Sequence, residues 1–372
     1  MNEENNSYKP DWTPAEHGDE FAIRIVKGVD QSFTPKVTKH FKKKEFTNET
    51  LIEGVLSNDR NRLAKTITLI ESTSPAHQAR SKEILAKLLP HSGKSIRIGI
   101  SGVPGAGKST LIESLGMYLI EQGHKVAVLT VDPSSSISKG SILGDKTRME
   151  NLSRNPSCFI RPSASGGTLG GVARKTRETI TVCEAAGYDV ILVETVGVGQ
   201  SEITVRSMVD FFLLVLISGG GDELQGMKKG VMEICDAILI NKADGENKKK
   251  AMMAKAEYSA ALHYLYPATE GWESRAYTAS ALTGEGIPEL WSVVEEFKKN
   301  TLNSGVFERR RRSQNVEWVE FMIRDYLYDS FFKNEEINRL FHEMRGKLLN
   351  GEVIPSSAFD ILKESWLKEH KN

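Results

Sequence analysis

A glycine-rich segment of the chain carries the residue types that bind a nucleotide phosphate. It has the sequence GVPGAGKS and matches the pattern G-x-x-x-x-G-K-[ST]. An apolar, strand-like run at 96–100 precedes it, and an amphipathic, helix-like stretch at 109–122 follows it. In that context the glycines let backbone N–H groups surround the phosphates, and the helix N-terminus adds partial positive charge. The predicted phosphate-binding residues are Gly102, Val103, Pro104, Gly105, Ala106, Gly107, Lys108, Ser109 and Thr110.

Two side chains of this segment predict metal-assisted phosphoryl transfer. Lys108 is expected to reach the β- and γ-phosphates, and the Ser109 hydroxyl is expected to bind Mg²⁺. Mg²⁺ also takes carboxylate ligands, directly or through water, and three acids at expected loop positions qualify. An Asp-Pro turn for Asp132 and a helix cap for Asp145 remain structural alternatives. The predicted magnesium ligands are Ser109, Asp132, Asp145 and Glu194.

The sequence ETVG at 194–197 indicates how the γ-phosphate is sensed. It occupies the place of the DxxG motif of GTPases, with Gly197 positioned to contact the γ-phosphate. Small GTPases place a water-orienting glutamine directly after this glycine, whereas this chain has Val198, and its nearest glutamine is Gln200. We therefore predict slow hydrolysis that needs a further contribution. The candidate catalytic side chains are Lys108, Asp132, Glu194 and Arg148, with Lys146 as a second candidate charge stabiliser.

The sequence NKAD at 241–244 predicts which base is bound. It ends another apolar run, and the Asp244 carboxylate can accept from both N1–H and the 2-amino group of guanine, which adenine lacks. The Lys242 stem is expected to lie over the base, and the backbone of SAL at 280–282 is expected to contact guanine O6. The predicted ligand is GTP or GDP rather than ATP. The predicted base-binding residues are Asn241, Lys242, Asp244, Ser280, Ala281 and Leu282.

Five short apolar runs predict the scaffold that positions these loops. They are rich in β-branched residues and alternate with amphipathic stretches, which is typical of parallel strands covered on both faces. The predicted fold class is α/β, a P-loop NTPase with a doubly wound, mostly parallel sheet and with N-terminal and C-terminal helical extensions. The predicted strands are 96–100, 125–131, 190–194, 211–217 and 237–241.

The extensions differ from the central part in their apolar periodicity. The N-terminal extension predicts a helix that carries Leu51 through Ile70, with Asn48 or Thr50 as its N-cap, and a second helix over 76–89. The apolar surface of the C-terminal extension fits a cap on the domain or a dimer arm. The predicted parts are a polar arm at 1–47, a helical lead-in at 48–93, a P-loop GTPase domain at 94–300 and a helical C-terminal part at 301–372.

Bulk composition excludes several classes of function. The chain has 372 residues with 49 basic and 49 acidic side chains, so it has no global positive field for nucleic acid or anionic membrane. Local basic runs at 42–44, 248–250 and 309–312 are interpreted as solvated faces or loops, and the role of the last run stays open. No segment is long and apolar enough to span a bilayer. The polar N-terminus resembles neither a signal nor a transit peptide, so we expect a cytoplasmic protein.

The three cysteines are Cys158, Cys183 and Cys235, and no two of them form a CxxC motif. This argues against a disulfide scaffold and a cysteine metal site, and it fits a reducing compartment. The absence of such ligands also weighs against a metal-delivery GTPase of the UreG or HypB type. His124 stands alone after a helix and is expected to be solvated.

Several long strings together resemble the MeaB/ArgK/MMAA family. They are GVPGAGKST, VDPSSSISKGSILGDKTRM, RPSASGGTLGGVARKTRE, DVILVETVGVGQSE, GGGDELQGMKKG, INKADG and ERRRRSQNVEW. The resemblance extends from about Arg62 to Ser357, and the polar N-terminal arm lies outside it. It implies a SIMIBI-type P-loop GTPase that acts as a chaperone for an adenosylcobalamin-dependent acyl-CoA mutase of the methylmalonyl-CoA mutase type. Such a protein gates cofactor loading and protects the mutase.

The resemblance also implies roles for particular segments. The family is homodimeric through its C-terminal helical arm, and Asp132 and Asp145 fall on its Mg²⁺-proximal acids. The sequence SGGGDELQGMKKG at 218–230 matches an extra switch loop that passes the nucleotide state to the mutase. Consecutive glycines make such a loop easy to reshape, and its charges can exchange partners between states. The residues assigned to this coupling are Gly219, Gly220, Gly221, Asp222, Glu223, Gln225, Lys228 and Lys229.

Two further interpretations of the same motifs stay open. A small-molecule kinase, which the older arginine/ornithine transport ATPase label suggests, needs a pocket acid as its base, and the sequence offers no distinct candidate. The guanine motif also speaks against that label. A nucleotide-locked scaffold without useful turnover fits the slow hydrolysis. A partner-dependent rate would separate that scaffold from a chaperone.

Overall fold

The computed structural model describes residues 7–8, 23–24, 46–131, 149–162, 169–195, 201–219 and 229–369. The chain divides into two compact units, 1–46 and 47–372. In the first unit, β1 (Ser7–Tyr8) pairs antiparallel with β2 (Ile23–Arg24). All further elements belong to the second unit. The finer division of the chain into four parts stays a prediction.

A seven-stranded sheet forms the centre of the second unit, in the order β5-β4-β6-β3-β7-β8-β9. Every neighbouring pair in it is parallel, which confirms the predicted fold class. All five predicted runs form strands. The bounds are β3 (Ile96–Gly102), β4 (Val126–Val131), β5 (Cys158–Arg161), β6 (Val190–Thr195), β7 (Phe211–Ile217), β8 (Ala237–Asn241) and β9 (Arg275–Thr278).

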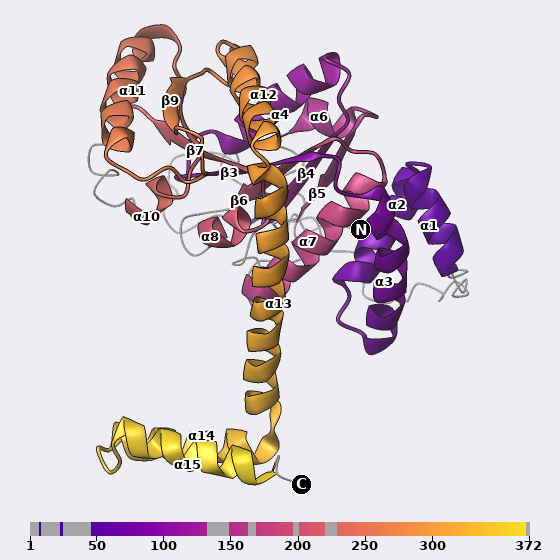
Figure 1. The fold of residues 1–372 in the computed structure, drawn as a ribbon, viewed down its shortest axis with the longest axis vertical. Helices are drawn as coiled ribbons and strands as arrows, with labels where there is room; N and C mark the ends of the chain where they lie inside the picture. The colour runs from indigo at the N-terminus through magenta and orange to yellow at the C-terminus, as the bar shows by residue number, and fades with distance from the viewer. Residues whose placement is uncertain are drawn as a thin grey trace. The chain divides into compact units, whose positions relative to one another are not determined.

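Helices cover both faces of this sheet (Figure 1). On one face, α4 (Lys108–Glu121) and α12 (Ile287–Asn303) bury alternate strand residues, and α6 (Glu150–Arg154) adds to this core. On the other face lie α7 (Leu169–Ala185) and α8 (Ser201–Arg206), which pack on β4, β6 and β3. The helix α11 (Lys248–His263) packs along β8 and β9. Short elements are α10 (Lys229–Met232), η2 (Leu89–His91) and η3 (Gly245–Asn247).

Three helices precede the sheet where the sequence predicted two. They are α1 (Asn48–Leu56), α2 (Arg60–Glu71) and α3 (Pro75–Leu88). The predicted first helix breaks because Asn58 adopts a left-handed φ of 57° and the Asp59 carboxylate caps α2. The predicted N-cap at Asn48 or Thr50 is also wrong, since the Thr47 hydroxyl accepts from Thr50 N at 3.3 Å.

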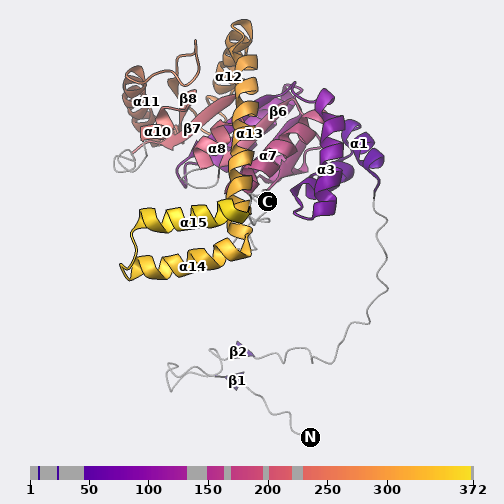
Figure 2. The same ribbon diagram turned by 60° about the horizontal axis from the view of Figure 1, so that its bottom comes forward.

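Three helices end the chain, α13 (Val306–Lys333), α14 (Glu335–Leu349) and α15 (Pro355–Glu369). Within this part, α13 packs against α12 and α14, and α14 packs against α15 as a hairpin (Figure 2). Many large apolar side chains here are exposed. They are Val316, Val319, Ile323, Tyr326, Leu327, Tyr328, Leu349, Ile354, Phe359, Ile361 and Leu367.

The basic run 309–312 does not form a wholly solvated face, which corrects the sequence-based interpretation. The side chains of Arg310 and Arg311 are only 17% and 11% exposed. Arg311 makes a two-bonded ion pair with Asp210, with distances of 2.8 and 2.7 Å, and Arg310 donates to the Asp210 carbonyl at 2.8 Å. The run therefore contacts the sheet domain of its own chain. By contrast, the run 248–250 is exposed as expected.

Among the described helices, none combines the length and apolar character needed to cross a bilayer.

Candidate functional site

The loops that carry the predicted motifs follow β3, β6 and β8, and in a parallel sheet they meet at the carboxyl edge. The first loop starts at Gly102, whose φ is 151°. A Cβ there would lie 2.0 Å from the carbonyl oxygen of Val215 on β7. Only glycine lets β3 and β7 stay paired this far along their length.

The phosphate-binding segment and the guanine motif are joined by one amide. Asn241 Nδ2 donates to the carbonyl of Ala106 at 2.8 Å, and its Oδ1 accepts from the backbone N–H of Ala281 at 3.1 Å. Gly107, with φ of 84°, caps α4, and a Cβ on it would lie 2.7 Å from Asn241 Nδ2. The structure thus brings three predicted segments together around Asn241.

Lys108 lies at the start of α4 and folds its ammonium over the loop. Nζ donates to the carbonyls of Gly102 and Val103 at 2.7 and 3.2 Å. Burial lowers the pKa of Lys108, while the nearby carboxylates of Glu194 and Glu202 act in the opposite sense and favour its charged form. A partly desolvated ammonium at a helix N-terminus attracts anions strongly, which suits phosphate.

Ser109 and Glu194 form an oxygen pair one residue further along. The Ser109 hydroxyl donates to Glu194 Oε1 at 3.0 Å, and the Glu194 side chain is buried at the end of β6. Its neighbour Thr195 donates to the hydroxyl of Ser101 at 2.9 Å. Hydroxyl and carboxylate oxygens are the ligands Mg²⁺ prefers, so the residues present fit a magnesium ion beside Lys108.

The guanine motif makes a tight turn behind β8. Lys242 has a left-handed φ of 58°, and Ala243 N donates to the carbonyl of Ala279 at 3.1 Å. The hydroxyl of the buried Ser280 donates to the Asp244 carboxylate. Leu282 is 82% exposed, so its side chain contributes little to this packing. The motif and the 280–282 segment therefore support each other.

Of the remaining predicted residues, some lie in the part of the chain that the structure describes and the others lie outside it. Pro104, Gly105 and Thr110 are exposed around the phosphate-binding segment. Gly219 has a left-handed φ of 90°, and Lys229 begins α10. The other predictions lie outside the described residues, and these are Asp132, Asp145, Lys146, Arg148, Gly197, Gly220, Gly221, Asp222, Glu223, Gln225 and Lys228.

Comparison with known proteins identifies the family. A family described as "Methylmalonyl Co-A mutase-associated GTPase MeaB" matches residues 63–336. The chain belongs to this family. It is 45% identical over 320 residues to "GTPase ArgK" of Escherichia coli (strain K12), which covers 86% of this chain and 97% of that protein. It is 43% identical over 332 residues to "Methylmalonic aciduria type A homolog, mitochondrial" of Mus musculus, with coverages of 87% and 80%.

A solved structure supports the same assignment. The crystal structure of a protein called "LAO/AO transport system kinase" superposes with a TM-score of 0.72 at 38% identity, over 86% of this chain and 98% of that one. The resemblance seen in the sequence is therefore confirmed. As a MeaB family member with this fold, the chain is a P-loop GTPase that binds guanine nucleotide.

Three polar residues next to the predicted nucleotide site are not among the predicted site residues. Glu202 on α8 is buried and close enough to favour the charged form of Lys108. Ser218, at the end of β7, and Asn247, in η3, are joined by a hydrogen bond of 2.7 Å beside the guanine motif. For Ser218 and Asn247, the available signal was their position directly after a strand or a motif, which places side chains at the carboxyl edge.

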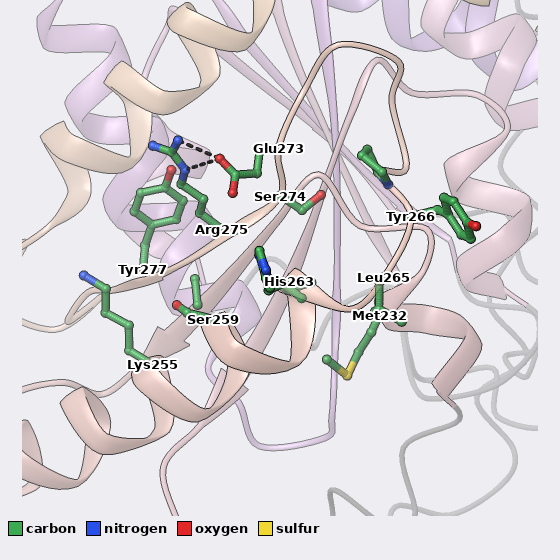
Figure 3. A pocket seen from close by; sticks show the side chains of 13 residues that line it. Met232, Lys255, Ser259, His263, Leu265, Tyr266, Glu273, Ser274, Arg275 and Tyr277 are labelled. Atoms are coloured by element: carbon green, nitrogen blue, oxygen red, sulfur yellow. Dashed lines mark hydrogen bonds and ion pairs between the residues drawn. The ribbon is translucent and has the colours of Figure 1, made fainter.

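A cavity of about 600 Å³ lies away from this site, between α10, α11 and β9. Figure 3 shows Lys255, Ser259 and His263 of α11 along it, with the ion pair of Glu273 and Arg275 on the other side. None of its lining residues belongs to the predicted nucleotide site. The nucleotide site of this family member is therefore identified by its motifs and not by this cavity.

Two further expectations concern metal-binding side chains. Cys158, Cys183 and Cys235 are all buried, and burial raises the pKa of Cys158 and of Cys235 to about 12. Thiols with so high a pKa are poor metal ligands at neutral pH. His124 is not simply solvated, because its Nδ1 lies 2.7 Å from the Asp189 carboxylate and its ring packs edge-on against Trp291.

Proposed function

We propose that the chain is a Mg²⁺-dependent GTPase that serves as a chaperone of an adenosylcobalamin-dependent acyl-CoA mutase of the methylmalonyl-CoA mutase type. It gates cofactor loading and protects the mutase. The observation that carries the proposal is the match of residues 63–336 to a mutase-associated family, and it is supported by the hydrogen bonds that join Asn241 to Ala106 and Ala281. The expected location is the cytoplasm.

The residues of the carboxyl edge divide the work on the nucleotide. Backbone N–H groups of the phosphate-binding segment and the Lys108 ammonium bind the β- and γ-phosphates, with the ammonium exchanging its two loop carbonyls for phosphate oxygens. The Asp244 carboxylate, oriented by Ser280, accepts from N1–H and the 2-amino group of guanine. This division explains selection for guanine and for a triphosphate.

Magnesium is proposed to be held by Ser109 and Glu194, which already lie 3.0 Å apart, together with Asp132 and Asp145. When bound, the ion neutralises charge on the phosphates. Glu194 keeps the Ser109 hydroxyl oriented in the folded protein. Hydrolysis is proposed to be slow until a partner completes the site, with Arg148 as a candidate charge stabiliser.

The partner-facing parts are proposed to be 218–230 and the C-terminal helices. The segment 218–230 follows β7 directly, and its first residue, Ser218, is hydrogen-bonded to Asn247 beside the guanine motif. The C-terminal helices expose many large apolar side chains, which a second copy of the chain would cover in a homodimer. The four predicted parts then have separate roles, with 94–300 as catalytic domain and 301–372 as dimer arm.

The test is GTP turnover by the purified chain, alone and with a cobalamin-dependent acyl-CoA mutase. ATP serves as the nucleotide control, and Lys108→Ala gives the blank. We expect slow, GTP-selective turnover that the mutase accelerates. Turnover that ignores every such mutase would overturn the client assignment. A preference for ATP would overturn the guanine site itself.

A further inference from the structure

A chain of hydrogen bonds joins the end of β7 to the guanine motif. The Ser218 hydroxyl donates to Asn247 Oδ1 at 2.7 Å, and Asn247 Nδ2 donates to the carbonyl of Lys242 at 2.7 Å. The backbone N–H of Asn247 also donates to the carbonyl of Asp244 at 3.0 Å. Asn247 thus contacts both ends of the turn that presents the Asp244 carboxylate.

The chemistry of the partners fixes the orientation of this amide. The Lys242 carbonyl is only an acceptor, so the NH₂ group of Asn247 must face it, which leaves Oδ1 for the Ser218 hydroxyl. An aspartate would keep the acceptor but place a negative charge against the carbonyl. An alanine would remove both bonds. Among small side chains, asparagine therefore fits both partners.

The turn needs such support because of its backbone. Lys242 is one of two non-glycine residues with positive φ in the described part of the second unit, and that conformation persists only where surrounding contacts enforce it. The Asn247 amide supplies a contact on its carbonyl side. On the other side, Ser280 holds the Asp244 carboxylate. Together they fix the acceptor that distinguishes guanine.

We infer that Asn247 is a positioning residue for guanine recognition, and that Ser218 couples it to the end of β7. The inference rests on the proposed guanine site. Asn247 acts through Lys242 and Asp244 and does not contact the nucleotide. Because Ser218 also begins the proposed switch segment, the guanine turn and the start of that segment share one amide.

The test compares Asn247→Ala, Asn247→Asp and Ser218→Ala with the wild-type chain by titration calorimetry. The ligands are GDP, ADP and inosine diphosphate, which lacks the 2-amino group. Asn338→Ala is the matched control, because Asn338 Nδ2 donates to the Phe332 carbonyl at 3.0 Å far along the sequence, at α14. Thermal melting is followed for every variant.

We expect Asn247→Ala and Asn247→Asp to weaken GDP binding about tenfold, and Ser218→Ala about threefold. The difference in affinity between GDP and inosine diphosphate should also become smaller, more so in the two Asn247 variants than in Ser218→Ala. A purely structural role of Asn247 would not change this difference. The control should match the wild type. If Asn247→Ala fails to fold, the inference is tested by whether Ser218→Ala reduces the affinity difference between GDP and inosine diphosphate.

Two results are distinguishable failures. In the first, the wild type prefers GDP to ADP, but all three variants keep the wild-type ratio of the dissociation constants for GDP and inosine diphosphate. That result overturns the role of Asn247 alone. No preference for GDP over ADP in the wild type overturns the guanine site on which the inference rests.

Discussion

The two edges of the parallel sheet use charged residues in opposite ways. At the amino edge, where strands begin, Asp210 and Asp236 are almost fully buried and their partners are arginines of the same chain. Asp236 accepts from Arg206 at 2.7 and 3.2 Å and from the Phe212 N–H at 2.8 Å. These two carboxylates therefore form ion pairs that hold parts of the fold together.

At the carboxyl edge, charged groups instead lie beside glycine-containing loops, with Lys108 at the start of α4 and Glu194 near the end of β6. The Lys108 ammonium donates to two carbonyls of its own loop, and a positive-φ glycine such as Gly107 leaves space where a side chain would clash. Charge at one edge anchors α13 to the sheet, and charge at the other is arranged for a ligand. The difference predicts that changes at the amino edge act on stability and that changes at the carboxyl edge act on nucleotide.

Breaking the amino edge should give the largest effect. Arg311→Ala removes a buried partner from Asp210 and should lower the free energy of unfolding by about 3–5 kcal/mol. GDP affinity at 25 °C should stay within about threefold of wild type, because the described hydrogen-bond partners of Arg311 are Asp210, Gly93 and Ser95, which lie outside the predicted nucleotide site. Chemical unfolding and calorimetry measure the two quantities.

Arg309→Ala is the matched control for this experiment. Arg309 pairs with Glu270 at 2.7 Å, but both side chains are more than half exposed, at 59% and 75%. Its loss should change stability by less than about 1 kcal/mol. Equal destabilisation by the two substitutions would contradict the assignment of Arg311 as a buried anchor.

Breaking the carboxyl edge should leave the fold intact. Lys108→Ala should reduce GTP turnover by about 100-fold or more, because the ammonium stabilises charge on the transferred phosphoryl group. Melting temperature should not fall, since burial of this ammonium is unfavourable and lowers its pKa. Lys347→Ala in α14 controls for removal of a lysine. Turnover near wild type would contradict the phosphate-binding role.

A smaller effect is expected where the phosphate-binding segment contacts the guanine motif. Gly107→Ala should weaken GDP binding about tenfold, because its Cβ would lie 2.7 Å from Asn241 Nδ2. Gly123→Ala is the matched control, because Gly123 has a similar left-handed φ of 93° and a Cβ on it would meet open space. Both should lose about 1 kcal/mol of stability from backbone strain, but only the first should lose affinity. Equal affinities in calorimetry would show that the contact is unimportant.

The smallest effect concerns pH at the amino edge. Burial alone would raise the pKa of Glu184, but the Arg97 guanidinium, with bonds of 2.8 and 2.9 Å, and Ser95 hold the pKa below its usual value. A lowered folded-state pKa gives stability that is present above the unfolded pKa and is lost as pH falls through the folded pKa. The stability difference between wild type and Glu184→Gln should therefore be constant near neutrality and shrink in acid. A difference that grows in acid would contradict this pairing.

Local sequence patterns predicted the strands whose ends form the carboxyl edge. The glycine-rich segment and the guanine motif are each continuous in sequence. The five predicted strands are apolar runs of five to seven residues by their predicted bounds. The strands β5 and β9 lie outside the five predicted runs; each has four residues with an arginine at one end, and each lies at an edge of the sheet. Such a strand has too little periodicity to stand out from a loop.

Contacts between distant residues could not be predicted. The bond from Asn241 to Ala106 spans 135 positions, and the pair of Arg311 with Asp210 spans 101. A run of four arginines looks solvated in sequence, and only the fold shows which of them are buried. The break between α1 and α2 depends on one left-handed residue, Asn58, whose conformation local propensity does not fix.

The central claim is that the carboxyl edge is a guanine nucleotide site. Titration of the purified wild-type chain with GDP and with ADP, in the presence of Mg²⁺, tests it most directly. The account predicts that GDP binds at least about 100-fold more tightly than ADP, since adenine offers neither an N1–H nor a 2-amino donor to the Asp244 carboxylate. Equal binding of the two nucleotides, or tighter binding of ADP, would contradict it.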